Sequence, residues 1–195
     1  MAKKFYAVRK GYKTGVFNTW AECEKAVKGF KGAMYKSFLT LDEAKEYLGD
    51  SSSKKIDENL PFAFVDGSFN IATKVYGYGG FLNYNGKRYV LQGNGKDEEM
   101  ASMRNVSGEI LGSMAAMEKA IELGIEEINI YYDYMGIEMW AKGEWKRNKK
   151  GTIAYYDYYN SIKSALKVNF VKVKGHSGIE GNEEADRLAK ESVGI

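Results

Sequence analysis

The chain alternates between two hydrophobic periods, and these periods predict where its strands and helices lie. Residues 126–133 (EEINIYYD) alternate between apolar and polar positions, which is typical of a strand. Residues 107–124 instead repeat apolar side chains at the spacing of one helix face, and the repeating positions are Ile110, Met114, Met117 and Ile121. We expect Ser107 to cap this helix and Gly124 to end it.

Further elements are indicated by short apolar runs and by turn residues. Residues 61–69 (PFAFVDGSF) predict a buried strand that leads into a turn, and Asn85-Gly86 within 76–93 is a strong hairpin signal. The later predicted elements are helices at 134–143 and 154–166, a strand at 168–176 and an acidic helix after it. Strands joined by hairpins and followed by alternating strands and helices predict a mixed sheet covered by helices.

The first 48 residues carry a separate pattern of short aromatic-rich strands and helices. The predicted strands are 5–11, 15–20 and 33–38, and the predicted helices are 19–30 and 39–49. The stretch 48–61 (LGDSSSKKIDENLP) is polar and Ser-rich and contains the only proline, as expected of a linker. We therefore expect a small α+β domain over 1–48, a flexible linker over 49–60 and a larger domain over 61–195.

Composition limits the class of protein. The chain has 195 residues, of which 44% are hydrophobic and 28% charged, as in ordinary globular proteins. No apolar run approaches the length of a membrane span, and the first residues lack the apolar stretch of a signal peptide. The single cysteine, Cys23, excludes an internal disulfide and a cysteine-based zinc site. These features predict a cytoplasmic protein without a membrane partner.

The positive charge of the chain is concentrated at its front. Residues 1–48 carry ten Lys and Arg against five Asp and Glu, a net charge of +5, whereas the remaining 147 residues carry 19 against 21. A basic front end attached to a slightly acidic body is typical of a polyanion-binding module that carries a second function, although a merely solvated basic surface gives the same count.

Four acidic residues fall where a site could form. Asp66 and Asp133 follow apolar runs, Glu109 lies in the first turn of the helix predicted for 107–124, and Asp186 lies among apolar positions of the last helix. Open α/β sheets place their sites at the carboxyl ends of strands. Clustered carboxylates repel one another unless a divalent cation compensates their charge. All-oxygen ligation favours Mg²⁺ or Mn²⁺, and two such ions about 3.5–4 Å apart can catalyse phosphoryl displacement.

Each of these residues also has a purely structural interpretation. Asp66 could form a turn, Glu109 could complement the helix dipole, and Asp133 could cap the following helix. The only histidine, His176, could be an ordinary loop residue before a helix N-terminus. The residues alone therefore indicate metal-dependent chemistry on a polyanion, without deciding which side chains take part.

Four motifs resemble, in order, those of type 1 ribonuclease H: FVDGSFN, NVSGEILGSMAAM, INIYYD and GHSGIEGNEEADRLA. They span essentially all of residues 60–195. The resemblance implies an α/β fold, with the mixed five-stranded sheet of ribonuclease H flanked by helices. The metal ligands that it implies are Asp66, Glu109, Asp133 and Asp186. It also implies that His176 is the mobile-loop histidine, which assists product release or proton handling, and that Glu183 has a lesser role.

Residues 4–48 resemble the small hybrid-binding domain found at the front of many such enzymes and related to the amino-terminal part of caulimovirus viroplasmin. The stretches FYAVRKGYKTGVFNTWAEC and KGAMYKSF carry this resemblance. It implies that Trp20 and Tyr35 pack against the DNA strand and that Tyr6 and Lys36 contact its backbone. Interleaved rings and lysines suit binding that is indifferent to sequence.

The chain departs from the family pattern at several positions. A single Lys36 stands where two lysines are common, which lowers the expected affinity, and Tyr134 follows the third acid where a serine is common. The family often has two consecutive asparagines before the second acid, whereas this chain has Asn105 followed by Val106. One 2′-hydroxyl contact is therefore expected to be lost. The basic protrusion of some members is absent or shortened to GEWKRNKKG (143–151), and beside a separate binding domain we expect it to be dispensable.

The resemblance implies an endonuclease that cuts the RNA strand of an RNA–DNA hybrid and leaves 5′-phosphate and 3′-hydroxyl ends. Two Mg²⁺ ions, or Mn²⁺ in their place, are the implied cofactors. Asn70 and Asn105 are expected to check the RNA strand through its 2′-hydroxyls, and Arg104 to contact a phosphate. We expect the protein to act on the hybrid as a monomer.

Three other functions stay open at this point. The chain could bind hybrids without cleaving them, although all four acids are present. It could be a nuclease or integrase-like enzyme of the same fold that processes DNA, which the hybrid-binding front end disfavours. It could be an interaction scaffold of the viroplasmin kind, but that resemblance is confined to the first 48 residues.

Overall fold

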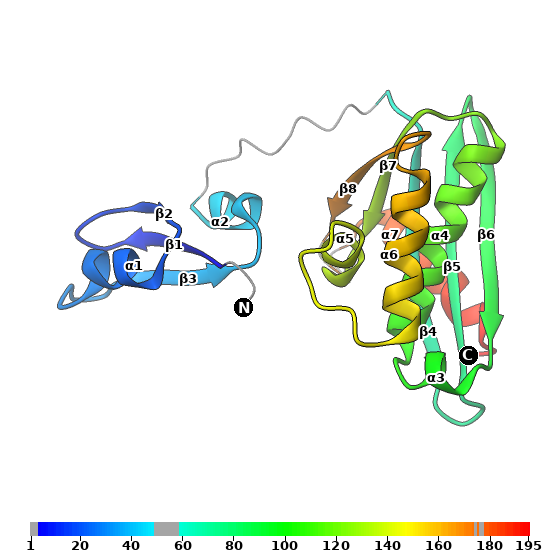
Figure 1. Cartoon of the computed structure of the whole chain (residues 1–195), viewed down its shortest axis with the longest axis horizontal. Coiled ribbons are helices and arrows are strands. Elements are labelled where there is room, and N and C mark those ends of the chain that lie inside the picture. The colour runs from blue at the N-terminus through cyan, green and yellow to red at the C-terminus, as the bar shows by residue number, and fades with distance from the viewer. Residues whose placement is uncertain (1–3, 49–58, 174, 176–177) are drawn as a thin grey trace. The chain divides into compact units, whose positions relative to one another are not determined.

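The computed structural model describes residues 4–48, 59–173, 175 and 178–195, and it divides the chain into two compact units (Figure 1). The front unit is Met1–Asp57 and the second unit is Glu58–Ile195. The linker expected at 49–60 lies outside the described residues except for Asn59 and Leu60. Within the part that is described, no helix combines the length and the apolar character needed to cross a membrane.

The front unit is a three-stranded antiparallel sheet with two helices, as the sequence predicts. Its sheet order is β2-β1-β3, and its elements are β1 (Phe5–Lys10), β2 (Gly15–Phe17), α1 (Trp20–Val27), β3 (Met34–Phe38) and α2 (Leu41–Tyr47). Thr19 starts α1 with a capping box, in which its side chain accepts from the Glu22 amide and the Glu22 carboxylate accepts from the Thr19 amide. Val8 packs with the buried residues of α1, including Cys23, and burial raises the pKa of the Cys23 thiol.

The second unit contains a mixed five-stranded sheet in the order β6-β5-β4-β7-β8. The strands are β4 (Phe62–Asn70), β5 (Val75–Tyr84), β6 (Lys87–Gly95), β7 (Glu127–Tyr132) and β8 (Lys167–Lys172). The helices are α3 (Glu98–Ala101), α4 (Asn105–Glu122), α5 (Gly136–Ala141), α6 (Lys150–Ile162) and α7 (Glu180–Ser192). Strands β4, β5 and β6 pair antiparallel, whereas β4, β7 and β8 pair parallel. The predicted fold class is confirmed.

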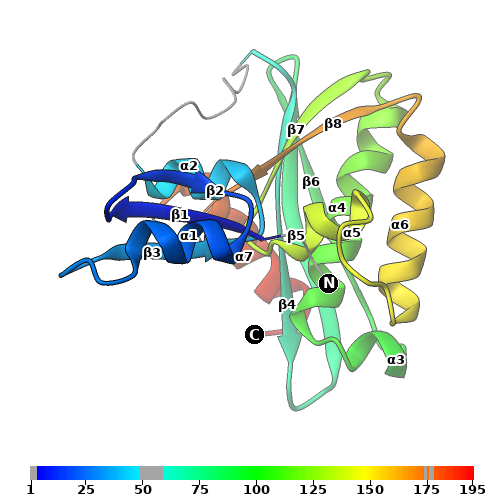
Figure 2. The same ribbon diagram turned by 60° about the vertical axis from the view of Figure 1, so that its left-hand side comes forward.

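Helices cover both faces of this sheet. In the turned view, α4 and α6 lie on one side of the strands and α7 on the other (Figure 2). The larger core lies under α4, where Ile110 and Met117 pack with Ile128 and Ile130 of β7. On the α7 side, a smaller core joins Phe64 and Phe81 to Ala185. Alternate residues of β7 accordingly meet different layers, since Ile128 and Ile130 belong to the larger core and Tyr131 packs against the smaller one.

Two local predictions in the region of the acids were wrong: the cap at Ser107 and the position of Glu109 in the first turn of its helix. The strand predicted for 61–69 is confirmed, and the alternative of a turn at Asp66 is not found, because β4 continues past it to Asn70 and pairs Asp66 with Gly79 of β5. Ser107 does not cap α4, because its hydroxyl donates to the carbonyl of Met100 and the helix already begins at Asn105. Glu109 consequently lies in the second turn of α4.

Glycines allow α4 to approach the sheet unusually closely. A Cβ added at Gly108 would lie 1.9 Å from the carbonyl oxygen of Gly77 and 2.8 Å from the Cα of Gly67, and both of these are backbone atoms. Backbone atoms cannot move aside as a side chain can. The first turns of α4 are therefore held against β4 and β5, where Asp66 lies.

The change Gly108→Ala is expected to lower the free energy of unfolding by at least about 2 kcal/mol, because the new methyl group overpacks this contact. Gly112→Ala, one turn later, is the matched control. A Cβ added at Gly112 would contact only side-chain atoms, those of Tyr78 at 3.2 Å and of Val65 at 3.4 Å. Alanine also stabilises a helix by about 1 kcal/mol relative to glycine. Urea unfolding of both variants measures the difference, and equal midpoints would contradict the close approach.

Candidate metal centre and nucleic-acid interface

Three carboxylates from three elements meet at one point of the second unit. One oxygen each of Asp66, Glu109 and Asp133 lies within 4.8 Å of the others. Strand β4 pairs with β7 up to Phe64 opposite Tyr131, and the same register continued by two residues places Asp66 beside Asp133. The parallel pairing therefore brings the two aspartates together just where β7 ends.

Glu109 reaches this point from α4 and is almost completely buried. Its side chain is 2% exposed, and its Oε2 atom has no hydrogen-bond partner among the described residues. A buried carboxylate oxygen without a donor loses its hydration without compensation. Such an atom points to a missing positive group at this place.

The electrostatics of the cluster agree with this interpretation. Burial raises the pKa of Asp66 to about 6, and the charges of Asp133 and Asp186 add to the increase. Burial, followed by the charges of Asp66 and Asp133, also raises the pKa of Glu109 well above its usual value. Asp66 and Glu109 are close enough to share a hydrogen bond when one of them is protonated. Without a cation, Asp66 and Glu109 therefore keep their protons to higher pH than exposed carboxyl groups do.

Asp186 lies beside this cluster but is not one of the three converging residues. It is on α7, and its Oδ2 atom forms an ion pair of 2.7 Å with Lys190 one turn later. Its charge nevertheless acts on Asp66. The structure thus brings three of the four predicted acids together and places the fourth within electrostatic reach.

The donor set fits a hard divalent cation. All donors are carboxylate oxygens, which Mg²⁺ and Mn²⁺ prefer, and the buried carboxylates lack a compensating charge. The cluster is therefore a metal-binding acidic site, and its oxygens alone do not select one of these ions.

The structure describes most, but not all, of the remaining predicted site residues of the second unit. His176 lies outside the described residues, and Glu183 is exposed in the first turn of α7. Gly175 lies directly against Asp133, because a Cβ on this glycine would come within 2.6 Å of the Asp133 carboxylate.

Arg104 and Asn105 are exposed at the start of α4. Arg104 has a positive φ of 55°, which is unusual for a residue other than glycine. The side chain of Asn70 already forms hydrogen bonds within the protein. Its Nδ2 donates to the carbonyl of Val193, and its Oδ1 accepts from the backbone amides of Ala72 and Thr73. The roles assigned to these three residues stay predictions.

In the front unit, three of the four predicted contact residues gather on one face. The rings of Tyr6 and Trp20 are 5.7 Å apart, and those of Trp20 and Tyr35 are 5.9 Å apart. Trp20 is 45% exposed and Tyr35 is 44% exposed, so neither is a core residue. Lys36 is exposed as well, but its ammonium lies over the ring of Phe38, and neighbouring residues of a strand point to opposite faces.

Sequence reasoning missed an aromatic cluster next to the acids. The rings of Tyr134, Trp140 and Trp145 contact one another at centroid distances of 5.7 to 6.4 Å. Burial raises the pKa of the Tyr134 phenol, and the charge of Glu109 raises it further. The only signal in the sequence was Tyr134 itself, in a position where relatives often have serine.

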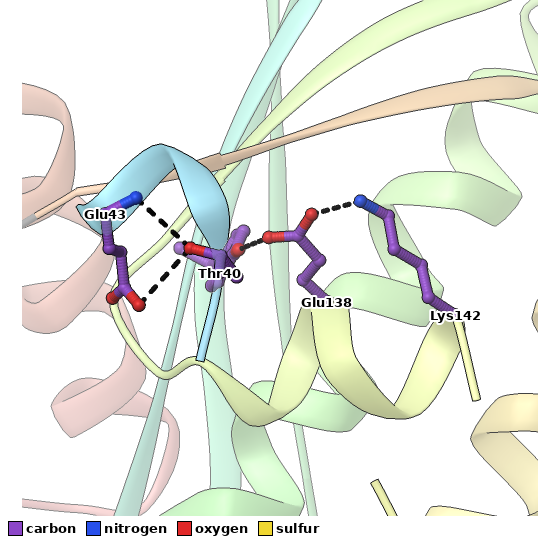
Figure 3. Close-up of polar contacts among 5 residues, drawn as sticks. Thr40, Glu43, Glu138 and Lys142 are labelled. Atoms are coloured by element: carbon purple, nitrogen blue, oxygen red, sulfur yellow. Dashed lines mark hydrogen bonds and ion pairs between the residues drawn. The ribbon is translucent and has the colours of Figure 1, made fainter. Parts of the chain in front are cut away.

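A partly buried polar pair also anchors the end of β7. The Tyr132 hydroxyl donates to Glu138 of α5 at 2.7 Å, and Glu138 forms an ion pair with Lys142 (Figure 3). Tyr132 directly precedes Asp133, so this pair fixes the strand end that carries the acid.

Figure 3 also draws Thr40, which belongs to the front unit and accepts from the amide of Glu43 at the start of α2.

Comparison with known proteins divides the chain in the same way. The family model described as "Ribonuclease H1 N-terminal domain" matches residues 4–48, and the model described as "RNase H" matches residues 59–193. Ribonuclease H1 of Homo sapiens is 29% identical, over 97% of this chain and 89% of the human protein.

Solved structures agree on the fold. The structure of RNase H1 from the halophilic archaeon Halobacterium salinarum NRC-1 matches with a TM-score of 0.53 at 20% identity, covering 68% of this chain and 96% of that one. LC11-RNase H1, solved in complex with an RNA/DNA hybrid, matches with a TM-score of 0.55 at 17% identity, covering the same 68% and 96%. At these identities the likeness concerns the fold alone.

Proposed function

The chain belongs to the RNase H family, with the ribonuclease H1 N-terminal domain ahead of the RNase H domain, and we propose that it hydrolyses the RNA strand of RNA–DNA hybrids through two divalent metal ions. The products are expected to be 5′-phosphate and 3′-hydroxyl ends. The observation that carries the proposal is the convergence of Asp66, Glu109 and Asp133, with the unpartnered oxygen of Glu109, inside the segment that matches the family.

The acids would hold the ions in defined roles. Asp66, Glu109 and Asp133 would provide the shared ligands, and Asp186 would complete the set after its carboxylate leaves Lys190. When bound, the ions activate the attacking water and neutralise the charge that develops on the leaving oxygen. Burial raises the pKa of Asp66 and of Glu109, and each carboxyl must lose its proton before it can bind an ion, so occupancy is expected to fall in acid.

Residues around the acids would recognise the RNA strand. We assign 2′-hydroxyl recognition to Asn70 and Asn105, a phosphate contact to Arg104, and product release or proton handling to His176. The wide, shallow minor groove of a hybrid displays 2′-hydroxyls, which duplex DNA lacks. The observation that supports this assignment is the exposed start of α4, where Arg104 directly precedes the helix and Asn105 is the first residue of the helix that carries Glu109.

A direct cleavage assay tests the proposal. The full chain is incubated with end-labelled RNA–DNA hybrid and Mg²⁺, with and without EDTA, beside single-stranded RNA, duplex RNA and duplex DNA. We expect internal cuts in the RNA of the hybrid only, and none with EDTA. Cleavage of duplex DNA would favour the alternative of a DNA-processing nuclease, and binding without cleavage in Mg²⁺ and Mn²⁺ would favour a hybrid-binding protein.

The front unit would raise the local concentration of hybrid at the acids through the connecting segment. The double change Trp20→Ala and Tyr35→Ala is expected to weaken hybrid binding at least about tenfold, because a base stacked on an aromatic ring contributes about 1–3 kcal/mol. The turnover rate on short, saturating hybrid should stay within about twofold. Fluorescence anisotropy and initial rates measure both quantities, and Met34→Ala, an exposed apolar residue of β3, is the control. Unchanged binding by the double variant would show that the ring cluster is not the interface.

A further inference from the structure

Helix α7 lies directly against the backbone of the sheet at the level of Asp66. Asp66 pairs with Gly79 of β5, and Gly79 pairs with Gln92 of β6, so the three residues form one row across three strands. A Cβ added at Gly79 would lie 2.0 Å from the backbone nitrogen of Ala189 in α7. The lack of a side chain at Gly79 therefore lets α7 rest on this row, beside one of the acids of the proposed metal site.

Two side-chain amides of the edge strand β6 bind the backbone of this helix. Gln92 donates from Nε2 to the carbonyl of Leu188 at 2.8 Å, and Asn94 donates from Nδ2 to the carbonyl of Ser192 at 2.7 Å. Ser192 is the last residue of α7, where carbonyl groups lack helical partners. Because both acceptors are backbone atoms, these bonds depend on where the helix lies along the sheet.

Arg88 of β6 makes a third connection, nearer the start of α7. Its Nη1 forms an ion pair of 2.6 Å with Glu184. Its Nε donates to Asn83 of β5 at 3.1 Å, and its guanidinium stacks 4.0 Å from the ring centre of Phe81. The sheet thus fixes Arg88 before Arg88 binds the helix. The three contacted positions of α7 follow one another at intervals of four residues, along one face of the helix.

Asp186 is the one predicted metal ligand whose position depends on α7. Its charge acts on Asp66, but its carboxylate is paired with Lys190 and is not among the three converging acids. Strands β4 and β7 and helix α4 carry those three acids. A displacement of α7 along the sheet would therefore change the distance from Asp186 to Asp66 without moving the other ligands.

On the premise of the proposed function, we propose that Gln92, Asn94 and Arg88 are positioning residues for the fourth metal ligand. They set the place of α7 on the sheet, and thereby the distance at which Asp186 joins the three converging acids around a divalent cation. Strand β6 carries none of the four acids, so its side chains act on the site only through the helix.

The test removes the two amide hydrogen bonds without changing any charge. The full chain with Gln92→Met and Asn94→Leu, here called the β6 variant, is titrated with Mn²⁺ by isothermal calorimetry in the absence of hybrid. We expect the affinity to fall about fivefold, which corresponds to about 1 kcal/mol, the net contribution of one neutral hydrogen bond. Val90→Thr is the matched control, because Val90 is exposed on the same face of β6 and its side chain makes no hydrogen bond.

A second background separates positioning from stability. The β6 variant is combined with Asp186→Asn, which removes the ligand through which these residues are proposed to act. In this background the β6 substitutions should change the Mn²⁺ affinity by less than about 1.5-fold, because the coupling between the two sites is lost. The thermal midpoint should fall equally in both backgrounds, since the helix loses the same bonds in each.

Cleavage gives a further readout. The Mg²⁺ concentration that gives the half-maximal rate should rise about fivefold in the β6 variant, while kcat at saturating Mg²⁺ stays within about twofold, because the positioned ligand is still present. If the double variant does not fold, Gln92→Met alone gives the same comparisons, since Gln92 lies in the row of Asp66.

Two results would overturn this inference: a Mn²⁺ affinity of the β6 variant equal to that of Val90→Thr, or an equal loss of affinity in the Asp186→Asn background. The second result would mean that β6 only stabilises the fold. A chain that binds Mn²⁺ in the expected way but does not cleave hybrid would contradict the proposed function alone, since the titration would still report on Asp186. A chain that binds no divalent ion would contradict both.

Discussion

Changing Asp66→Asn is expected to lower the rate of hybrid cleavage by about 10³-fold or more while hybrid binding is retained. Asp66 lies at the centre of the acidic cluster, within reach of Glu109, Asp133 and Asp186. An amide offers one neutral oxygen in place of a charged carboxylate, so the site loses charge and a ligand. Ion-assisted charge stabilisation is worth several kcal/mol, and each 1.4 kcal/mol corresponds to a factor of about ten in rate.

Single-turnover cleavage and equilibrium binding of the same labelled hybrid measure the two halves of this prediction. Asp157→Asn is the matched control, because Asp157 is an exposed acid on α6 and takes no part in the cluster. Both variants should bind hybrid like the unaltered chain through the aromatic face of the front unit. A cleavage rate for Asp66→Asn within tenfold of the control would remove Asp66 from the metal site.

The sequence predicted most of the fold because its signals are local and agree with one another. The two periods of hydrophobicity located β7 and α4, and the hairpin signal at Asn85-Gly86 located the turn between β5 and β6. The predictions that failed depend on longer-range contacts. Ser107 lost its expected capping role because Met100, seven residues away, accepts its hydroxyl.

The convergence of the acids was a guess from spacing, since carboxylates in distant elements give no local sign of proximity. The parallel register of β4 and β7 brings Asp66 to Asp133, and the backbone contact of Gly108 with Gly77 brings Glu109 to both. The tryptophan cluster was missed for a related reason. Trp140 and Trp145 have the composition of ordinary core residues, and only their packing on Tyr134 connects them to the site.

These contacts imply that the site is built at the expense of stability. Asp66 and Glu109 are both buried, and Glu109 keeps one oxygen without a partner. The glycine at position 108 allows α4 to lie against the sheet backbone, and this close approach keeps Glu109 near Asp66. Stability of the metal-free protein should therefore depend on the protonation of these two acids.

The metal-free protein is accordingly expected to lose stability as the pH rises from about 4 to about 7, and divalent metal is expected to restore it. The pKa of Asp66 is raised from 3.8 to about 6 in the folded state, so the folded state binds more protons than the unfolded state in this interval. The contribution is fully present below the unfolded pKa and is lost as the pH rises through the folded pKa. For Asp66 alone it amounts to about 3 kcal/mol, since one pKa unit corresponds to about 1.4 kcal/mol, and Glu109 acts in the same direction.

Asp66→Asn isolates this effect from the titration of all other groups. The difference in free energy of unfolding between the variant and the unaltered chain, measured by urea unfolding in EDTA, should grow in favour of the variant from near zero at pH 4 to about 3 kcal/mol at pH 7.5. Added Mg²⁺ should stabilise the unaltered chain at pH 7.5, by an amount that grows with ion concentration, and the variant much less. Because Asp157→Asn removes an exposed charge, its difference should stay flat across the same interval. If the difference in free energy of unfolding for Asp66→Asn also stayed constant with pH, the acids would not be buried together. A cluster without that shared burial would not need a cation to compensate its charge.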